Sequence, residues 1–246
     1  MDLNGRVVLL TGAKRVGAIV AAAVAARGAD VALAYNRSQV EADEAASDVR
    51  AKGRRSMVVK ADVSNAADCA ALVRAVESQL GRIDVLINMA SLYREVPFDE
   101  VGVTEWDSQL AVDLRGAFLC AKAVVPAMRK LGGGRIINFS DWVAASGRPR
   151  YKGYLSYYVA KAGVKALTEA LALELAGDNI LVNAIAPGPV LAPDDLTAEQ
   201  KKAVEDATPL KRWGGAVEIA KAVLALIDAD FITGETMRVD GGRHLS

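Results

Sequence analysis

The segment that decides the fold reads Val7-Val8-Leu9-Leu10-Thr11-Gly12-Ala13-Lys14-Arg15-Val16-Gly17. It opens on a continuous apolar run, which is typical of a strand covered on both faces of a sheet. A dinucleotide-binding fold needs small residues in the turn that follows, because the backbone must approach a pyrophosphate and present a helix N-terminus to it. Gly12 and Gly17 fit the first and last glycine of that turn, while Lys14 and Arg15 stand where a middle glycine is usual. An ordinary strand-to-helix turn is the alternative.

Similar apolar runs recur along the chain at the spacing of βα units, and repeated units of this kind predict a parallel sheet with right-handed crossovers. The predicted fold is α/β, a doubly wound Rossmann sheet flanked by helices, in a single domain over residues 1–246. The further strands are expected at Val31–Tyr35, Ser56–Val59, Ile83–Ile87, Arg135–Phe139 and Ile180–Ile185.

Helical patterns fill the segments between these runs. Ser38 and Glu41 match a capping box at the start of a helix. A buried helical stripe is expected where apolar residues repeat, at Val164, Leu167, Leu171 and Leu175. The irregular segment 188–210, with a short helix expected after Thr197, is predicted to be a substrate flap.

Composition excludes several classes of function. Thirty basic residues balance thirty acidic ones, so neither a nucleic-acid partner nor a membrane is expected. Two cysteines cannot form a disulfide framework, and the single histidine, His244, leaves no basis for a zinc site or a His-dependent triad. No metal is expected. The first residues lack the pattern of a signal peptide, so a soluble, cytoplasmic protein acting on a small molecule is expected.

The residues after the second run indicate which dinucleotide would bind. NAD-preferring folds place an acidic residue there, whereas this chain has Arg37 and Ser38, which favour a 2′-phosphate. NADPH or NADP+ is therefore the expected cofactor, with Lys14 and Arg15 adding positive charge, although a solvated Arg37 is the alternative. Further cofactor contacts are expected at Val16 in the turn and at the ends of the third and fourth runs, at Asp62, Val63, Asn88, Ala90 and Ser91.

Tyr157 and Lys161 are four residues apart, so on a helix they share a face. A tyrosine beside an ammonium and a cationic nicotinamide is expected to have a lowered pKa, which suits proton transfer. Such a spacing can occur by chance. The position of this Tyr–Lys pair, between the fifth and sixth strands, strengthens the prediction.

With these motifs the sequence resembles the short-chain dehydrogenase/reductase family over nearly its whole length. The resemblance implies a seven-stranded parallel sheet and a homotetramer or homodimer. It implies that Tyr157 donates a proton and that Lys161 binds the nicotinamide ribose and lowers the pKa of Tyr157. Further matches are Asn183, the cofactor-binding segment with Pro187, Gly188 and Val190, and the tail Gly234…Val239-Asp240-Gly241-Gly242.

The main departure from the family pattern is at the end of the fifth strand, where the family usually has a serine. Aligned at the strand start, Asp141 rather than Ser140 takes its position, although a register shift would restore Ser140. An ionised aspartate cannot donate to a ketone oxygen, but it can accept two N–H donors. The sequence thus resembles the pteridine-reductase branch, which also has an aromatic residue, here Tyr93, that stacks on the pterin. Trp142 is a further substrate candidate, and Asp113 stands where the family often has an Asn that supports the proton relay.

These features predict an NADPH-dependent reductase of a small molecule, with a pterin-like heterocycle as the leading substrate. A carbonyl or 3-oxoacyl thioester reductase that uses Ser140 is the alternative within the family. A nucleotide-binding sensor without turnover is a more distant one.

Overall fold

The computed structural model describes residues 1–193 and 196–245. Within them, seven strands form one parallel sheet in the order β3-β2-β1-β4-β5-β6-β7. The order reverses direction between β1 and β4, and a parallel sheet binds its ligands at such a switch point. The prediction of a doubly wound Rossmann fold is confirmed. The strands are β1 Val7–Thr11, β2 Asp30–Tyr35, β3 Ser56–Lys60, β4 Val85–Asn88, β5 Gly134–Phe139, β6 Ile180–Pro187 and β7 Thr236–Val239.

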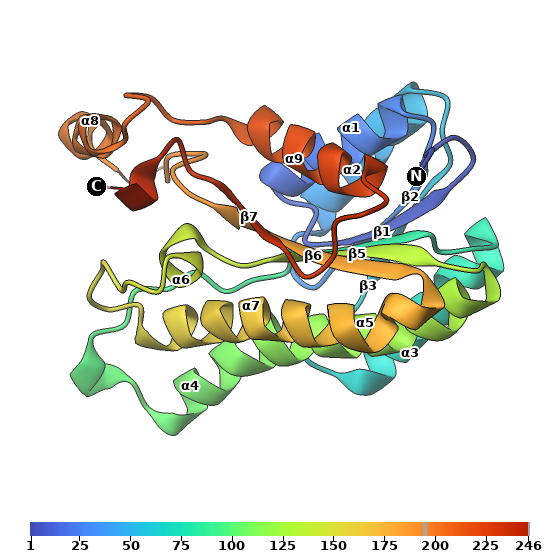
Figure 1. Cartoon of the computed structure of the whole chain (residues 1–246), viewed down its shortest axis with the longest axis horizontal. Coiled ribbons are helices and arrows are strands. Elements are labelled where there is room, and N and C mark those ends of the chain that lie inside the picture. The colour runs from blue at the N-terminus through green and yellow to red at the C-terminus, as the bar shows by residue number, and fades with distance from the viewer. Residues whose placement is uncertain (194–195, 246) are drawn as a thin grey trace.

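Helices cover both faces of the sheet (Figure 1). Helices α1 (Val16–Ala26), α2 (Gln39–Ala51) and α9 (Ala216–Asp228) pack on one face. Helices α3 (Ala66–Leu80), α5 (Gly116–Lys130) and α7 (Leu155–Leu175) pack on the other, with α4 (Val103–Leu110) beside α7. Alternate β1 residues feed the two cores: Val8 and Leu10 face α1, and Val7 and Leu9 face the opposite layer. The central strands are mostly apolar for this reason.

Two short helices lie toward the carboxyl end of the sheet, α6 (Trp142–Ala145) and α8 (Ala198–Ala207). Helix α8 confirms the helix expected after Thr197, and a capping box between Thr197 and Gln200 starts it. It belongs to the predicted flap, of which Asp194 and Asp195 lie outside the described residues. A π-helical turn, Ala111–Arg115, joins α4 to α5. Such turns are rare and often mark functional sites.

Two local predictions were wrong. Ser38 does precede α2, but its side chain makes no cap hydrogen bond, and Glu41 forms an ion pair with Lys14 at 3.1 Å. On α7 the buried stripe runs through Val164, Thr168, Ala172 and Leu175, whereas Leu167 and Leu171 are only half-buried. Leu167 turns toward a surface cleft formed with α4 and α5.

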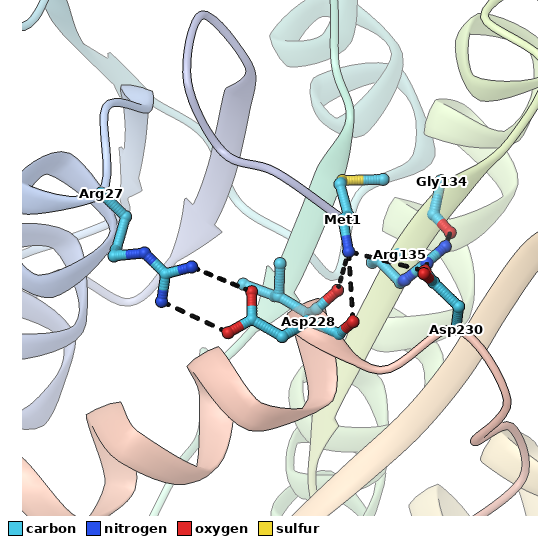
Figure 2. A network of polar contacts seen from close by, with 7 residues as sticks. Met1, Arg27, Gly134, Arg135, Asp228 and Asp230 are labelled. Carbon is cyan, nitrogen blue, oxygen red and sulfur yellow. Dashed lines mark hydrogen bonds and ion pairs between the residues drawn. The ribbon is translucent and has the colours of Figure 1, made fainter.

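The opposite end of the sheet is closed by polar contacts around the N-terminus (Figure 2). The Met1 ammonium donates to the carbonyl oxygens of Ile227 and Asp228 and pairs with Asp230, which also pairs with the buried Arg135. This network holds the first strand against α9. None of the helices in residues 1–193 and 196–245 combines the length and apolar character needed to cross a membrane.

Candidate active site

The glycine turn lies at the carboxyl end of β1, where its backbone packs against the loop after β4. Gly12 has φ +87°, and a Cβ there would lie 3.0 Å from the Met89 backbone. A Cβ on Gly17 would lie 2.1 Å from the Gly12 carbonyl oxygen. Both glycines are therefore required by the fold itself. Thr11 closes the junction, because its hydroxyl accepts the backbone N–H groups of Met89 and Ala90 at 3.1 and 3.2 Å.

Arg15, where a middle glycine is usual, adopts φ 53° and ψ −104°, a conformation that strains a residue with a side chain. Its guanidinium donates to the Ala192 carbonyl oxygen at 2.8 Å, which links the turn to the flap. Arg15 precedes α1, and no side chain caps the first backbone N–H groups of that helix. An uncapped helix N-terminus beside two cations, Lys14 and Arg15, fits a pyrophosphate. Val16 begins α1 at this point.

The end of β2 carries the residues expected to choose the cofactor. Arg37 is exposed and Ser38 half-buried, and the Asp62 carboxylate lies close enough for Arg37 to lower its pKa. The larger cause of that lowering is the hydrogen bond from the Ser64 hydroxyl. The Lys14–Glu41 ion pair places a carboxylate in the first turn of α2, which the sequence analysis did not count.

Buried amides connect the strands to α7. Asn88 donates its side-chain amide to Asn138 Oδ1 at 2.9 Å, and Asn138 donates in turn to the Thr168 hydroxyl at 2.9 Å. The chain of bonds therefore runs from β4 through β5 to α7 and fixes how α7 sits on the sheet. Sequence analysis missed Asn138 and Thr168, although a polar residue inside an apolar strand is a signal for such a contact.

Tyr157 and Lys161 lie one turn apart on α7, with Lys161 Nζ 5.6 Å from the Tyr157 ring centroid. The Tyr157 hydroxyl donates to Asp141 Oδ2 at 3.2 Å, and Asp141 Oδ1 accepts the Val143 backbone N–H at 2.8 Å. The Ser140 hydroxyl instead donates to the Lys161 carbonyl oxygen at 2.9 Å. Asp141 rather than Ser140 therefore meets the Tyr157 hydroxyl, since neighbouring residues in extended backbone face opposite ways.

Burial raises the pKa of the Tyr157 hydroxyl well above its usual value, and the carboxylates of Asp141 and Asp113 raise it further. The lowered pKa expected beside Lys161 and a bound cationic nicotinamide is not found in this structure, because burial and the two carboxylates raise it. Burial also raises the pKa of Asp141, against the lowering effects of the Val143 N–H and the Lys161 charge. Both groups are therefore weaker acids than exposed ones would be.

Asp113 lies in the π-helical turn and pairs with Lys161, whose Nζ is 3.0 Å from Asp113 Oδ1. Their side chains are 0% and 4% exposed. The Asp113 carboxylate also accepts hydrogen bonds from the Ser91 hydroxyl, the Leu92 backbone N–H and the Gln109 side-chain amide. Four donors therefore meet the Asp113 carboxylate, which is the counter-charge of Lys161 beside Tyr157. Gln109, one turn before Asp113, was missed by the sequence analysis.

Aromatic rings surround the Tyr157 hydroxyl. Tyr93 meets the Tyr157 ring edge-on at 5.0 Å between centroids and stacks on Tyr154 at 4.9 Å. Trp142 is 4% exposed and packs edge-on against Tyr151 at 6.2 Å. Tyr151 and Tyr154 come from the segment between α6 and α7.

The remaining predicted residues line the same edge of the sheet. Val63 is buried and contacts Gly116 at the start of α5. Gly188 packs so closely on Asp240 that a Cβ would lie 2.4 Å from the Asp240 side chain. Pro187 ends β6, and the buried Val190 accepts a backbone hydrogen bond from Gly215. The carboxyl ends of β1, β4, β5 and β6 thus bring the predicted cofactor and proton-transfer residues to one edge.

The geometry agrees with the comparisons to known proteins. The chain matches the family model described as Enoyl-(Acyl carrier protein) reductase over residues 12–244. It is 37% identical over 242 residues to the 3-oxoacyl-(acyl-carrier-protein) reductase of Staphylococcus aureus, a match that spans 96% of this chain and 97% of that protein.

Two solved structures are similar over almost the whole chain. A short-chain dehydrogenase/reductase from Serratia marcescens is 31% identical with a TM-score of 0.92, over 99% of this chain and 100% of that one. A blue fluorescent protein from a metagenomic library, in complex with NADPH, is 29% identical with a TM-score of 0.90, over 99% of each chain. The chain is an oxidoreductase and belongs to the short-chain dehydrogenase/reductase family.

Proposed function

We propose that the protein is an NADPH-dependent reductase of a small-molecule substrate, with Tyr157 as its proton donor. One observation carries the proposal: the Tyr157 hydroxyl donates to Asp141, and Lys161 Nζ lies 5.6 Å from the Tyr157 ring centroid, at the sheet edge that also holds the glycine turn. When bound, the dinucleotide supplies the hydride. Tyr157 then delivers a proton to the atom that gains negative charge. The unionised Tyr157 hydroxyl carries the proton that this step needs.

The neighbouring residues hold Tyr157 in place. Asp113 fixes the Lys161 ammonium at 3.0 Å and so positions it beside the Tyr157 ring. Asp141 accepts the Tyr157 hydrogen bond and is itself fixed by the backbone of α6. Asp141 can therefore orient a substrate and share a proton with Tyr157.

The preference for NADPH rests on charge at the end of β2. Arg37 and Ser38 stand where an acidic residue would select NAD, and Lys14 adds a second cation nearby. Pairing of Lys14 with Glu41 weakens this charge only slightly, since both groups are exposed to solvent. A neighbour of similar structure binds NADPH, which supports the proposal.

Two substrate classes have separate support. The relatives that are 37% identical are 3-oxoacyl-(acyl-carrier-protein) reductases, which favours a 3-oxoacyl thioester. Asp141 favours a pterin-like heterocycle, because its carboxylate, not the Ser140 hydroxyl, faces Tyr157 and can accept ring N–H donors. Tyr93, exposed beside Tyr157, could stack on such a ring.

Steady-state oxidation of NADPH separates these classes. Purified protein is assayed with acetoacetyl thioesters, dihydrobiopterin and simple ketones, alongside a Tyr157→Phe control that keeps the ring. Turnover of thioesters alone excludes the heterocycle, and turnover of dihydrobiopterin alone excludes the thioester. Cofactor binding without turnover of any of them, unchanged in the Tyr157→Phe variant, contradicts the reductase proposal itself.

We also propose that the protein is a homodimer or homotetramer. Support comes from an open cleft over α4, α5 and α7 with an apolar lining that includes Leu114, Phe118 and Leu167. A second copy would bury this surface. Light scattering of the wild type and of a Phe118→Glu variant tests the proposal, and a monomeric wild type contradicts it.

A further inference from the structure

Three tyrosine rings meet in the site, and two of them come from outside the Tyr157–Lys161 pair. We define the tyrosine triad as Tyr93, Tyr154 and Tyr157. Tyr93 stacks on Tyr154 with 4.9 Å between the ring centroids and an interplanar angle of 27°. Tyr93 and Tyr154 each meet the Tyr157 ring edge-on, at 5.0 and 6.3 Å between centroids. The triad therefore places a stacked pair of rings directly beside the ring of the proposed proton donor.

The stacked pair joins two loops that are distant in the sequence. Tyr93 follows β4, and Tyr154 ends the segment between α6 and α7. The two loops are tied close to these rings, because the Val96 backbone N–H donates to the Gly153 carbonyl oxygen at 2.7 Å. Gly153 is required there, since it has φ +81° and a Cβ would lie 2.7 Å from Glu95 Cγ. Backbone contacts as well as stacking therefore hold the two rings together.

The two stacked rings differ in exposure. Tyr93 is 59% exposed, whereas Tyr154 is half-buried and also meets the Tyr151 ring edge-on at 6.4 Å. Tyr154 is thus held by aromatic rings on two sides, and it supports Tyr93, whose surface is open to a ligand. An aromatic ring that is held in place before binding loses little conformational entropy when a ligand stacks on it.

Asp141 connects this exposed ring to the reacting groups. Burial raises the pKa of the Tyr93 hydroxyl, and the Tyr154 hydroxyl and the Asp141 carboxylate raise it further. Asp141 also accepts the Tyr157 hydroxyl at 3.2 Å. The exposed Tyr93 ring and the proposed proton donor are therefore neighbours of the same carboxylate.

We propose that Tyr154 is a positioning residue for substrate recognition: it holds Tyr93 so that a planar, conjugated ring of the substrate stacks on Tyr93 beside Tyr157. The inference rests on the proposed function, since it places the reacting atom of the substrate at Tyr157. It narrows the substrate to compounds whose reducible bond belongs to a flat ring or adjoins one. A saturated ring or an acyclic chain has no π-face to stack and is disfavoured.

Two unreactive amides with the same carbon skeleton test this inference without turnover. Naphthalene-2-carboxamide is planar, and decahydronaphthalene-2-carboxamide is saturated. Calorimetric titration uses protein saturated with NADP+, so that the cofactor site is filled. The wild type should bind the planar amide more tightly than the saturated one. Tyr154→Leu should weaken binding of the planar amide by about 2- to 10-fold and leave binding of the saturated amide unchanged.

Two further variants separate positioning from folding. The Tyr154 side chain makes no cap hydrogen bond to α7, so its replacement leaves the start of that helix intact. Tyr154→Phe keeps the ring and should bind the planar amide within about twofold of the wild type. Tyr158→Leu makes the same change in a tyrosine of α7 outside the triad and should bind both amides like the wild type. Equal wild-type affinity for the two amides, binding of neither, or an equal loss in Tyr158→Leu overturns the proposal.

Kinetics with a matched pair of ketones ask whether the same surface serves the reaction. 2-Tetralone has an aromatic ring fused to its ketone ring, and 2-decalone has the same carbon skeleton without the aromatic ring. Tyr154→Leu should raise KM for 2-tetralone, with kcat and both constants for 2-decalone unchanged. A lower kcat for both ketones at unchanged KM contradicts the positioning role. If neither ketone is reduced, the reductase proposal fails for ketones, while the amide titration still decides the role of Tyr154.

Discussion

Replacing Asp113 by alanine would leave the Lys161 ammonium buried without its counter-charge. The two side chains are 0% and 4% exposed and their charged atoms are 3.0 Å apart, so water cannot take the place of the lost carboxylate. Removing one partner of such a pair destabilises a fold by about 3–5 kcal/mol. Lys161 would keep its hydrogen bond to the Phe139 carbonyl oxygen and its contact with the Tyr157 ring, neither of which supplies a counter-charge. We therefore expect Asp113→Ala to lower the free energy of unfolding by about 3–5 kcal/mol.

The reverse change, Lys161→Met, should cost less. The Asp113 carboxylate would keep three donors, from Ser91, Leu92 and Gln109, and hydrogen bonds of this kind stabilise a buried carboxylate. We expect a loss of about 1–3 kcal/mol, and a similar loss for Asp113→Asn, which keeps an acceptor for these donors.

Urea unfolding followed by tryptophan fluorescence and circular dichroism measures these differences, and equal m-values establish that the variants unfold between comparable states. The order of the variants is the critical result. A Lys161→Met variant as unstable as Asp113→Ala, or an Asp113→Ala variant as stable as the wild type, would refute the reasoning from the buried pair.

Four other changes test the site and its surroundings. Tyr157→Phe should lower kcat by about 10²–10⁴-fold with cofactor affinity retained, and a fluorescence titration with NADPH checks the second part. Arg37→Glu should raise KM for NADPH by about tenfold or more and favour NADH, because it repels the 2′-phosphate; an unchanged cofactor ratio in initial rates would count against Arg37. Asp141→Asn should stabilise the fold relative to the wild type increasingly as pH rises above the ordinary aspartate value. Burial raises the pKa of Asp141, so its protonated form favours the fold and its ionisation opposes it. Urea unfolding at several pH values measures this trend, and a gain in stability that does not depend on pH would contradict it. Arg15→Gly should raise stability by up to about 1 kcal/mol, because relief of the strained φ exceeds the added chain entropy; thermal melting checks the sign.

Local pattern was enough to predict most of the framework. The apolar runs predict the strands because strands covered on both faces are built mostly of apolar residues. Strand β7 is partly exposed and has no such run, so it was expected only from the family resemblance. The glycine turn is likewise local, since Gly12 and Gly17 are required wherever this strand enters a helix so tightly. Tyr157 and Lys161 share a face because helical spacing alone aligns residues four apart.

Contacts between distant segments were decided by the tertiary structure. Only the packing of the π-helical turn on α7 pairs Asp113 with Lys161. The raised pKa of Tyr157 likewise depends on the folded chain, because burial is its largest cause and the carboxylates of Asp141 and Asp113 add to it. The direction of the Asp141 side chain depends on how β5 ends against α7. Arg150 and Arg243 both contact the Trp142 ring because of where the C-terminal segment lies. Periodicity encodes which face of an element is buried, whereas the charge around a buried group depends on which elements meet there, and that is a property of the folded chain.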